Sequence, residues 1–184
     1  MSKRSVFCVA SSRGRADRIL HDLKEAEFAS TEISVLFLDS AASEARAAAG
    51  KASAPSGAAV VRPAGEIRGV LGWIDCIRSL AIPGVGPLIA AGPVAAVLSS
   101  RTVGGIAGGL ADFDVPNVEA SRYEAKIKEG QILIAVHSEN PEKSDQAREI
   151  FNANEAEAVF TMIDVFTPRT LLKGASGPQR ESAA

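Results

Sequence analysis

The sequence predicts an α+β fold of the ferredoxin-like type, in which a four-stranded antiparallel sheet carries two helices on one face. Two strand–helix–strand patterns, one near each end of the 184-residue chain, are the main observation behind this prediction. An apolar segment rich in glycine and proline separates the two patterns. We therefore expect duplicated βαβ halves joined by an inserted helical hairpin.

The first half begins with an apolar run at 5–10, which is typical of a buried strand. Ser11 and Ser12 follow and favour the start of a helix, because their hydroxyls can cap its first N–H groups. A second apolar run at 33–38 predicts the next strand. The apolar face of the intervening helix is expected to consist of Ala16, Ile19, Leu20 and Leu23, which recur at helical spacing.

The middle of the chain differs in character. Residues 41–57 are rich in Ala, Ser and Gly and predict a linker, whereas 67–80 carries apolar residues at helical spacing. Residues 80–98 contain no charged side chain, but three prolines and three glycines interrupt them. A single straight helix is therefore not expected there, and a buried or interfacial hairpin is.

The second half repeats the first. A helix is expected at 116–129, ended by Gly130, followed by a strand at 131–137. Asn140 and Pro141 then predict a helix start, and 158–163 is a β-favouring run. The expected segments are the first βαβ half at 1–40, a flexible linker at 41–66, the apolar helical insertion at 67–115, a helix plus the second half at 116–163, and a loose tail at 164–184.

Self-association is the leading functional hypothesis. A four-stranded sheet with two helices offers no room to bury a segment as apolar as 80–98, so copies of the chain are expected to cover it in a homo-oligomer, such as a large ring or shell. Overlapping Gly-x-x-x-Gly spacings at 104/108 and 105/109 favour close helix pairing. The expected interface residues are Leu80, Ile82, Val85, Leu88, Ile89, Val94, Val97, Leu98, Gly104, Gly105, Gly108 and Gly109. Two alternatives remain: the hairpin packs on its own domain, or the protein is membrane-associated and the hairpin inserts into a membrane or attaches to its surface.

Two stretches of the sequence resemble a known family. They are LAIPGVGPLIAAGPVAAVL at 80–98 and GGIAGGLADFDVPNVEASRYEAKIKEGQILIAVH at 104–137. Both are similar to phrases of the bacterial general stress protein (heat-induction) family, which has a YflT-like N-terminal unit and a Gly/Ala-rich apolar centre. The resemblance implies a bacterial, stress-associated, non-catalytic protein. Trp73, Asp75 and Arg78 depart from the more uniformly Gly/Ala-rich pattern of the family, which weakens the case for a double-spanning membrane hairpin.

Composition and charge exclude several classes. A formal net charge of −2 does not suit a nucleic-acid binder, and two distant cysteines, Cys8 and Cys76, cannot form a disulfide framework. The apolar run at 6–10 is too short for a signal peptide, so we expect a cytoplasmic protein. No metal-ligand spacing appears, and no cofactor is expected. With only His21 and His137 as bases we expect no enzyme, although His137, at a strand end, could line a pocket.

One short segment has the chemistry of an anion site. Ser11, Ser12, Arg13 and Arg15 follow a strand and open a helix, where free N–H groups and the helix dipole attract anions. A small-ligand or anion-binding regulatory module is therefore a further alternative. The simpler interpretation is that Ser12 caps the helix and the arginines are solvated.

Overall fold

A computed structural model describes residues 4–39, 74, 77–100 and 105–162 of the chain. Six strands form one open sheet, in the order β3-β4-β2-β5-β1-β6, and every neighbouring pair is antiparallel. The strands are β1 (Arg4–Ala10), β2 (Ile33–Leu38), β3 (Arg78–Ile82), β4 (Gly86–Ala91), β5 (Ile132–Ser138) and β6 (Glu157–Met162).

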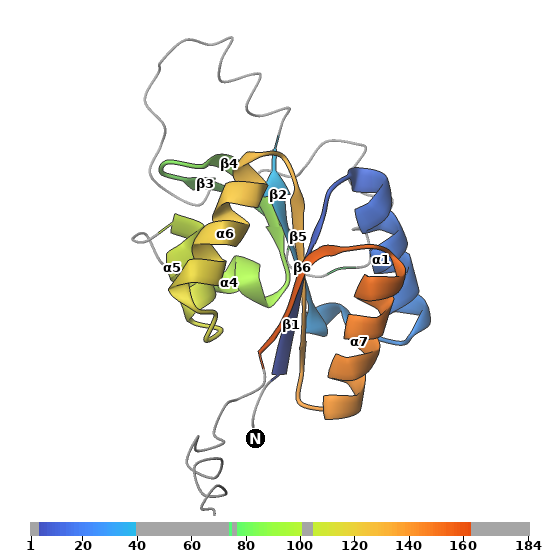
Figure 1. Ribbon diagram of the computed structural model, residues 1–184. Helices are drawn as coiled ribbons and strands as arrows, with labels where there is room; N and C mark the ends of the chain where they lie inside the picture. The colour runs from blue at the N-terminus through green and yellow to red at the C-terminus, as the bar shows by residue number, and fades with distance from the viewer. Residues whose placement is uncertain (1–3, 40–73, 75–76, 101–104, 163–184) are drawn as a thin grey trace, which may run out of the picture.

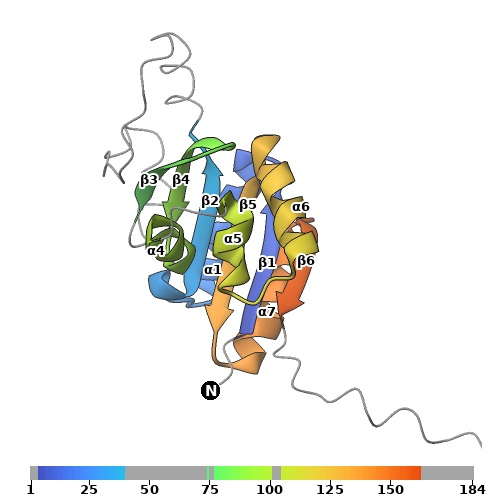
Figure 2. The same ribbon diagram turned by 90° about the vertical axis from the view of Figure 1, so that its left-hand side faces the viewer.

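Helices cover both faces of this sheet (Figure 1). On one face lie α1 (Arg13–Glu25) and α7 (Pro141–Ala153). On the other lie α4 (Pro93–Ser100), α5 (Gly105–Ala111) and α6 (Asn117–Lys128), as Figure 2 shows from that side. A short 3-10 helix, η1 (Ser30–Glu32), leads into β2. The described part of the chain is therefore a three-layer α+β structure.

The predicted four-stranded, ferredoxin-like sheet with helices on one face is wrong. Both strand–helix–strand units form, as β1-α1-β2 and β5-α7-β6, but β3 and β4 extend the sheet to six strands. The expected helical hairpin is instead a β-hairpin turning between Gly84 and Gly86, both with positive φ, followed by short helices. Apolar runs of five or six residues between Gly and Pro fit strands as well as helices, and β2 supplies the hydrogen-bonding edge that decides between them.

The helix expected at 67–80 is wrong at residues 78–80, which belong to β3. Its remaining positions lie outside the described residues, apart from Ile74 and Ile77. The linker at 41–66 and the tail at 164–184 also lie outside them.

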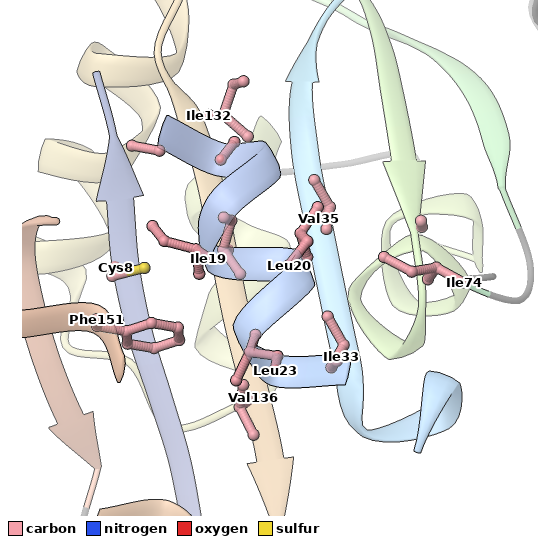
Figure 3. Close-up of a cluster of buried hydrophobic side chains, with 14 of the residues drawn as sticks. Cys8, Ile19, Leu20, Leu23, Ile33, Val35, Ile74, Ile132, Val136 and Phe151 are labelled. Carbon is pink, nitrogen blue, oxygen red and sulfur yellow. The ribbon is translucent and has the colours of Figure 1, made fainter. Parts of the chain in front are cut away.

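One core lies between the sheet and the helices α1 and α7 (Figure 3). The apolar face predicted for the first helix is confirmed, because Ala16, Ile19, Leu20 and Leu23 are all buried. Cys8 is buried in the same core, where it acts as a packing residue. Phe151 of α7 fills the space beside it.

A second core lies between the opposite face and the helices α4, α5 and α6. Strand β4 contributes side chains to both cores. Leu88 and Ala90 lie in this core, and Ile89 and Ala91 lie in the core on the opposite face. Tyr123 of α6 is fully buried here, and its hydroxyl donates to the carbonyl oxygen of Ala158 at 2.9 Å. The apolar middle of the chain thus finds burial inside its own fold.

Within the residues described, no single helix is long and apolar enough to cross a membrane.

Candidate functional site

A histidine near the end of β5 is held at both of its ring nitrogens. Nδ1 of His137 lies 2.9 Å from Oγ of Ser5, and Nε2 lies 3.0 Å from Oγ of Ser34. The register explains this arrangement, because Ser5 on β1 stands opposite His137 and Ser34 on β2 stands opposite Ala135. Side chains alternate along a strand, so all three polar groups emerge on the face that α4, α5 and α6 cover.

Aromatic rings fix the plane of this imidazole. Phe113, between α5 and α6, stacks on His137 with 4.7 Å between ring centroids and 28° between planes. Phe7 meets the ring edge-on at 5.9 Å and 79°. One stacked ring, one edge-on ring and hydrogen bonds at both nitrogens leave His137 little rotational freedom.

A hydrogen bond also links the start of α4 to Ser34. Oγ of Ser34 accepts a hydrogen bond from the backbone N–H of Val94 at 3.1 Å. Gly92 makes this approach possible, since its φ is +77° and a Cβ there would overlap the carbonyl oxygen of Ile33. A residue with a side chain would push α4 away from β2.

Ser5 and His137 lie in the wall of a cleft of about 720 Å³. In Figure 1 the starts of β1 and α7, which both contribute to it, lie at the lower end of the sheet. This volume lies within the range of about 300–1,000 Å³ that is usual for small-molecule sites. The remaining lining residues are Thr31, Glu32, Pro93, Asp112, Phe113, Asp114, Ser138, Glu139, Asn140 and Lys143.

Both signs of charge occur in this cleft, with an acidic excess. Four carboxylates and one ammonium group line it, and the ammonium of Lys143 lies 3.3 Å from Oε2 of Glu32. Glu32 also accepts from the N–H of Ala29 at 2.9 Å, so its carboxylate is fixed in place. Asn140 caps α7 by accepting from the N–H of Glu142. The cleft therefore presents polar groups that hydrogen bonds and an ion pair within the fold hold in place.

The predicted anion site at Ser11, Ser12, Arg13 and Arg15 is occupied by contacts within the chain. Ser12 caps α1 by accepting from the N–H of Arg15. The guanidinium of Arg15 donates to Oγ of Ser11 and forms an ion pair with Glu155 at 3.2 Å. The guanidinium of Arg13 lies over the ring of Phe37, 5.8 Å from its centroid. Anion binding at this segment stays a prediction.

The expected interface residues are for the most part inside the fold. Leu80, Ile82, Leu88, Ile89, Val94 and Leu98 are buried, whereas Val85 and Val97 are half-buried. Gly109 packs directly against Leu98, Gly105 and Gly108 are half-buried, and Gly104 lies outside the described residues. Assembly is expected because a four-stranded fold has no room to bury the apolar segment at 80–98. The observed fold, with six strands and a helical layer on each face, provides that room. Self-assembly itself stays a prediction.

The other reactive side chains lie apart from the cleft. His21 is exposed on α1 and faces Glu25 at 3.6 Å, in keeping with an ordinary surface residue. Burial raises the pKa of the Cys8 thiol well above its usual value. Cys76 lies outside the described residues, and no group of three or more potential metal ligands occurs within them.

The sequence indicated His137 as a pocket residue but missed its partners. Ser5 and Ser34 are buried hydroxyls within runs that are otherwise apolar, and that exception is the signal that was available. Phe113 and the two aspartates beside it gave no such signal, because they reach the cleft only through the packing of α5 and α6.

No protein-family model, no curated protein and no solved structure matches the chain. The resemblance to the stress-protein family therefore stays a prediction.

Proposed function

We propose that this chain is a small-ligand-binding module whose binding site is the cleft beside His137. The observation that carries the proposal is a histidine fixed between two buried serines in the wall of that cleft. A concave site with a few rigid, convergent polar groups is the usual form of a small-molecule site. The charged groups around the rim, with both signs present, favour a polar ligand over an apolar one.

Binding is better supported than catalysis by the same contacts. Ser5 and Ser34 are 5% and 2% exposed, and their hydroxyls hold the imidazole in place. A nucleophilic serine needs a histidine that is ready to accept its proton, and here the ring is shared between two hydroxyls. We therefore retain the expectation of a non-catalytic protein as part of the proposal.

The site is proposed at the cleft and not at Ser11–Arg15. Arg15 already has a carboxylate partner in Glu155, so an anion would have to compete with that ion pair. The groups that line the cleft belong to six segments of the chain that the fold brings together.

Thermal unfolding with defined probes tests the proposal. The probes are glycinamide, putrescine, succinate and inorganic phosphate, each added to the full chain. Thr31→Trp fills the cleft from an exposed position that holds none of its hydrogen bonds, and Val118→Trp places the same side chain on an exposed site of α6. We expect at least one probe to raise the Tm of the parent and of Val118→Trp, but not of Thr31→Trp.

Two results would contradict the proposal. One is that no probe raises the Tm of the parent. The other is that a probe stabilises Thr31→Trp as well as the parent but fails to stabilise the double variant Arg13→Ala/Arg15→Ala, which would locate binding at the start of α1.

A further inference from the structure

We infer that the hydroxyl of Ser34 determines which ring nitrogen of His137 carries the hydrogen. Ser34 is 2% exposed, and within the described residues its Oγ contacts two polar groups, the N–H of Val94 and Nε2 of His137. The Val94 N–H can only donate, so it uses one lone pair of Oγ. The hydroxyl hydrogen of Ser34 then has one acceptor within reach, which is Nε2. A buried hydroxyl hydrogen without an acceptor is costly, so Ser34 donates to Nε2.

The hydrogen bond that Ser34 donates to Nε2 also fixes the direction of the hydrogen bond between His137 and Ser5. With Nε2 as an acceptor, the neutral imidazole carries its hydrogen on Nδ1, which donates to Oγ of Ser5 at 2.9 Å. Ser5 lines the cleft, and its Oγ is occupied as an acceptor by this bond. The hydroxyl hydrogen of Ser5 remains available to the contents of the cleft.

The result is a directed chain of four groups. It runs from the backbone N–H of Val94 at the start of α4, through Ser34 and His137, to Ser5. Each donor polarises the next, so the last hydroxyl is a stronger donor than an isolated serine. We infer that the cleft, in the proposed function on which this inference rests, binds a molecule that places a carbonyl oxygen on Ser5 and a cationic or neutral N–H group among the carboxylates.

The charges of the cleft determine whether the ligand's acceptor is a carboxylate or an uncharged carbonyl oxygen. Glu32 and Lys143 form an ion pair with each other, so the unneutralised charge that a carboxylate ligand would meet includes the exposed carboxylates of Asp114 and Glu139. An uncharged carbonyl oxygen avoids this repulsion, and an amine or amide N–H elsewhere on the ligand is attracted by it. Amino amides therefore fit the inferred class, whereas dicarboxylates do not.

Nitrogen NMR of the two imidazole rings tests the direction of the chain without any ligand. His137 and His21 are the only histidines, so two sets of ring signals are expected. At a pH where both rings are neutral, His137 should show the Nδ1–H tautomer almost alone, and exposed His21 should show a mixture. Ser34→Ala should shift His137 toward a mixture, and Ser34→Thr, which restores the hydroxyl, should restore the single tautomer. An Nε2–H tautomer of His137 in the parent would overturn the inference.

Probe binding tests the ligand class separately. Glycinamide should bind the parent about tenfold more tightly than propylamine, which lacks the carbonyl oxygen, and Ser5→Ala should remove that difference. Ser5→Ala should leave the His137 tautomer unchanged, because Ser34 sets it. If succinate binds in the cleft and glycinamide does not, the proposed function stands and the ligand class fails. If the tautomer is as inferred but no probe binds, the direction of the chain stands and the proposed function fails.

Discussion

Gly92 packs its Cα directly against the carbonyl oxygen of Ile33, with a backbone φ of +77°. This contact brings the first turn of α4 onto β2, so that the N–H of Val94 reaches the hydroxyl of Ser34. The position of α4, the orientation of His137 and the shape of the cleft wall therefore depend on one residue without a side chain.

Gly92→Ala should destabilise the fold by about 3 kcal/mol, since it combines a strained positive φ with an overlap against rigid backbone. Denaturant unfolding measures the change. Gly14→Ala is the matched control, because Gly14 lies near the start of α1 with no atom within 4 Å of an added Cβ. That control should stabilise the protein by about 0.5 kcal/mol. Equal effects of the two variants would contradict the packing described here.

Ile89→Asp should unfold the single chain, whether or not copies of it associate. Ile89 is 1% exposed in the core beneath α1, and a carboxylate there should cost about 4 kcal/mol or more. Val118→Asp, on an exposed residue, should leave the stability within about 0.5 kcal/mol of the parent. Unfolding curves measured together with light scattering distinguish a core residue, whose loss unfolds the chain, from an interface residue, whose loss lowers the native mass. A folded Ile89→Asp protein of lower native mass would instead show that Ile89 acts at an interface between copies.

Glu124 should contribute to acid sensitivity by linking α6 to α5. Burial alone would raise the pKa of Glu124, but hydrogen bonds from Lys128 at 2.8 Å and from the N–H of Ala107 at 3.2 Å outweigh burial and hold the pKa below its ordinary value of 4.5. A carboxylate with a lowered pKa in the folded state stabilises the protein above its unfolded pKa. That contribution is lost as the pH falls through the folded value.

Glu124→Gln should therefore be less stable than the parent at neutral pH, and the difference should shrink as the pH falls below about 4.5. Urea unfolding across this pH range measures the effect. Glu25→Gln serves as a control, because Glu25 is exposed and its ion-pair partner in the described part of the chain is the exposed His21. A difference that stays constant with pH would show that the charge of Glu124 has no role.

The thiol of Cys8 should be inert in the folded protein. Its side chain is fully buried, and burial raises its pKa, so neither access nor thiolate is available to a reagent. In a Cys76→Ala background, labelling by iodoacetamide should be slow under native conditions and fast in denaturant. Rapid native labelling of Cys8 would contradict the burial of β1 beneath α1 and α7.

The elements that could be predicted from the sequence are those whose pattern is long and local. The helix 13–25 shows four apolar residues at helical spacing behind a serine cap, and the helix 141–153 has an Asn-Pro start. Strands β3 and β4 carry no such local signal, because their register with β2 is a long-range property. The sequence therefore predicts a sheet that is two strands too narrow, and it leaves the segment at 80–98 without a place in the fold.

In the candidate site, too, a local feature could be predicted from the sequence and the long-range contacts could not. His137 at a strand end was visible as a pocket candidate, but its partners lie 132 and 103 residues away along the chain. Only the antiparallel pairing of β5 with both β1 and β2 brings the two serines to one imidazole. Phe113 completes the site through the packing of α5 against α6, which no local pattern encodes.

Amide NMR of the full chain, titrated with glycinamide, tests the central claim most directly. We predict that the largest shift changes fall on the residues that line the cleft, notably 112–114 and 137–140, and that Thr31→Trp abolishes them while Val118→Trp preserves them. Absence of saturable shifts, or shifts centred on residues 11–15 that persist in Thr31→Trp, would contradict the assignment of this cleft as the binding site.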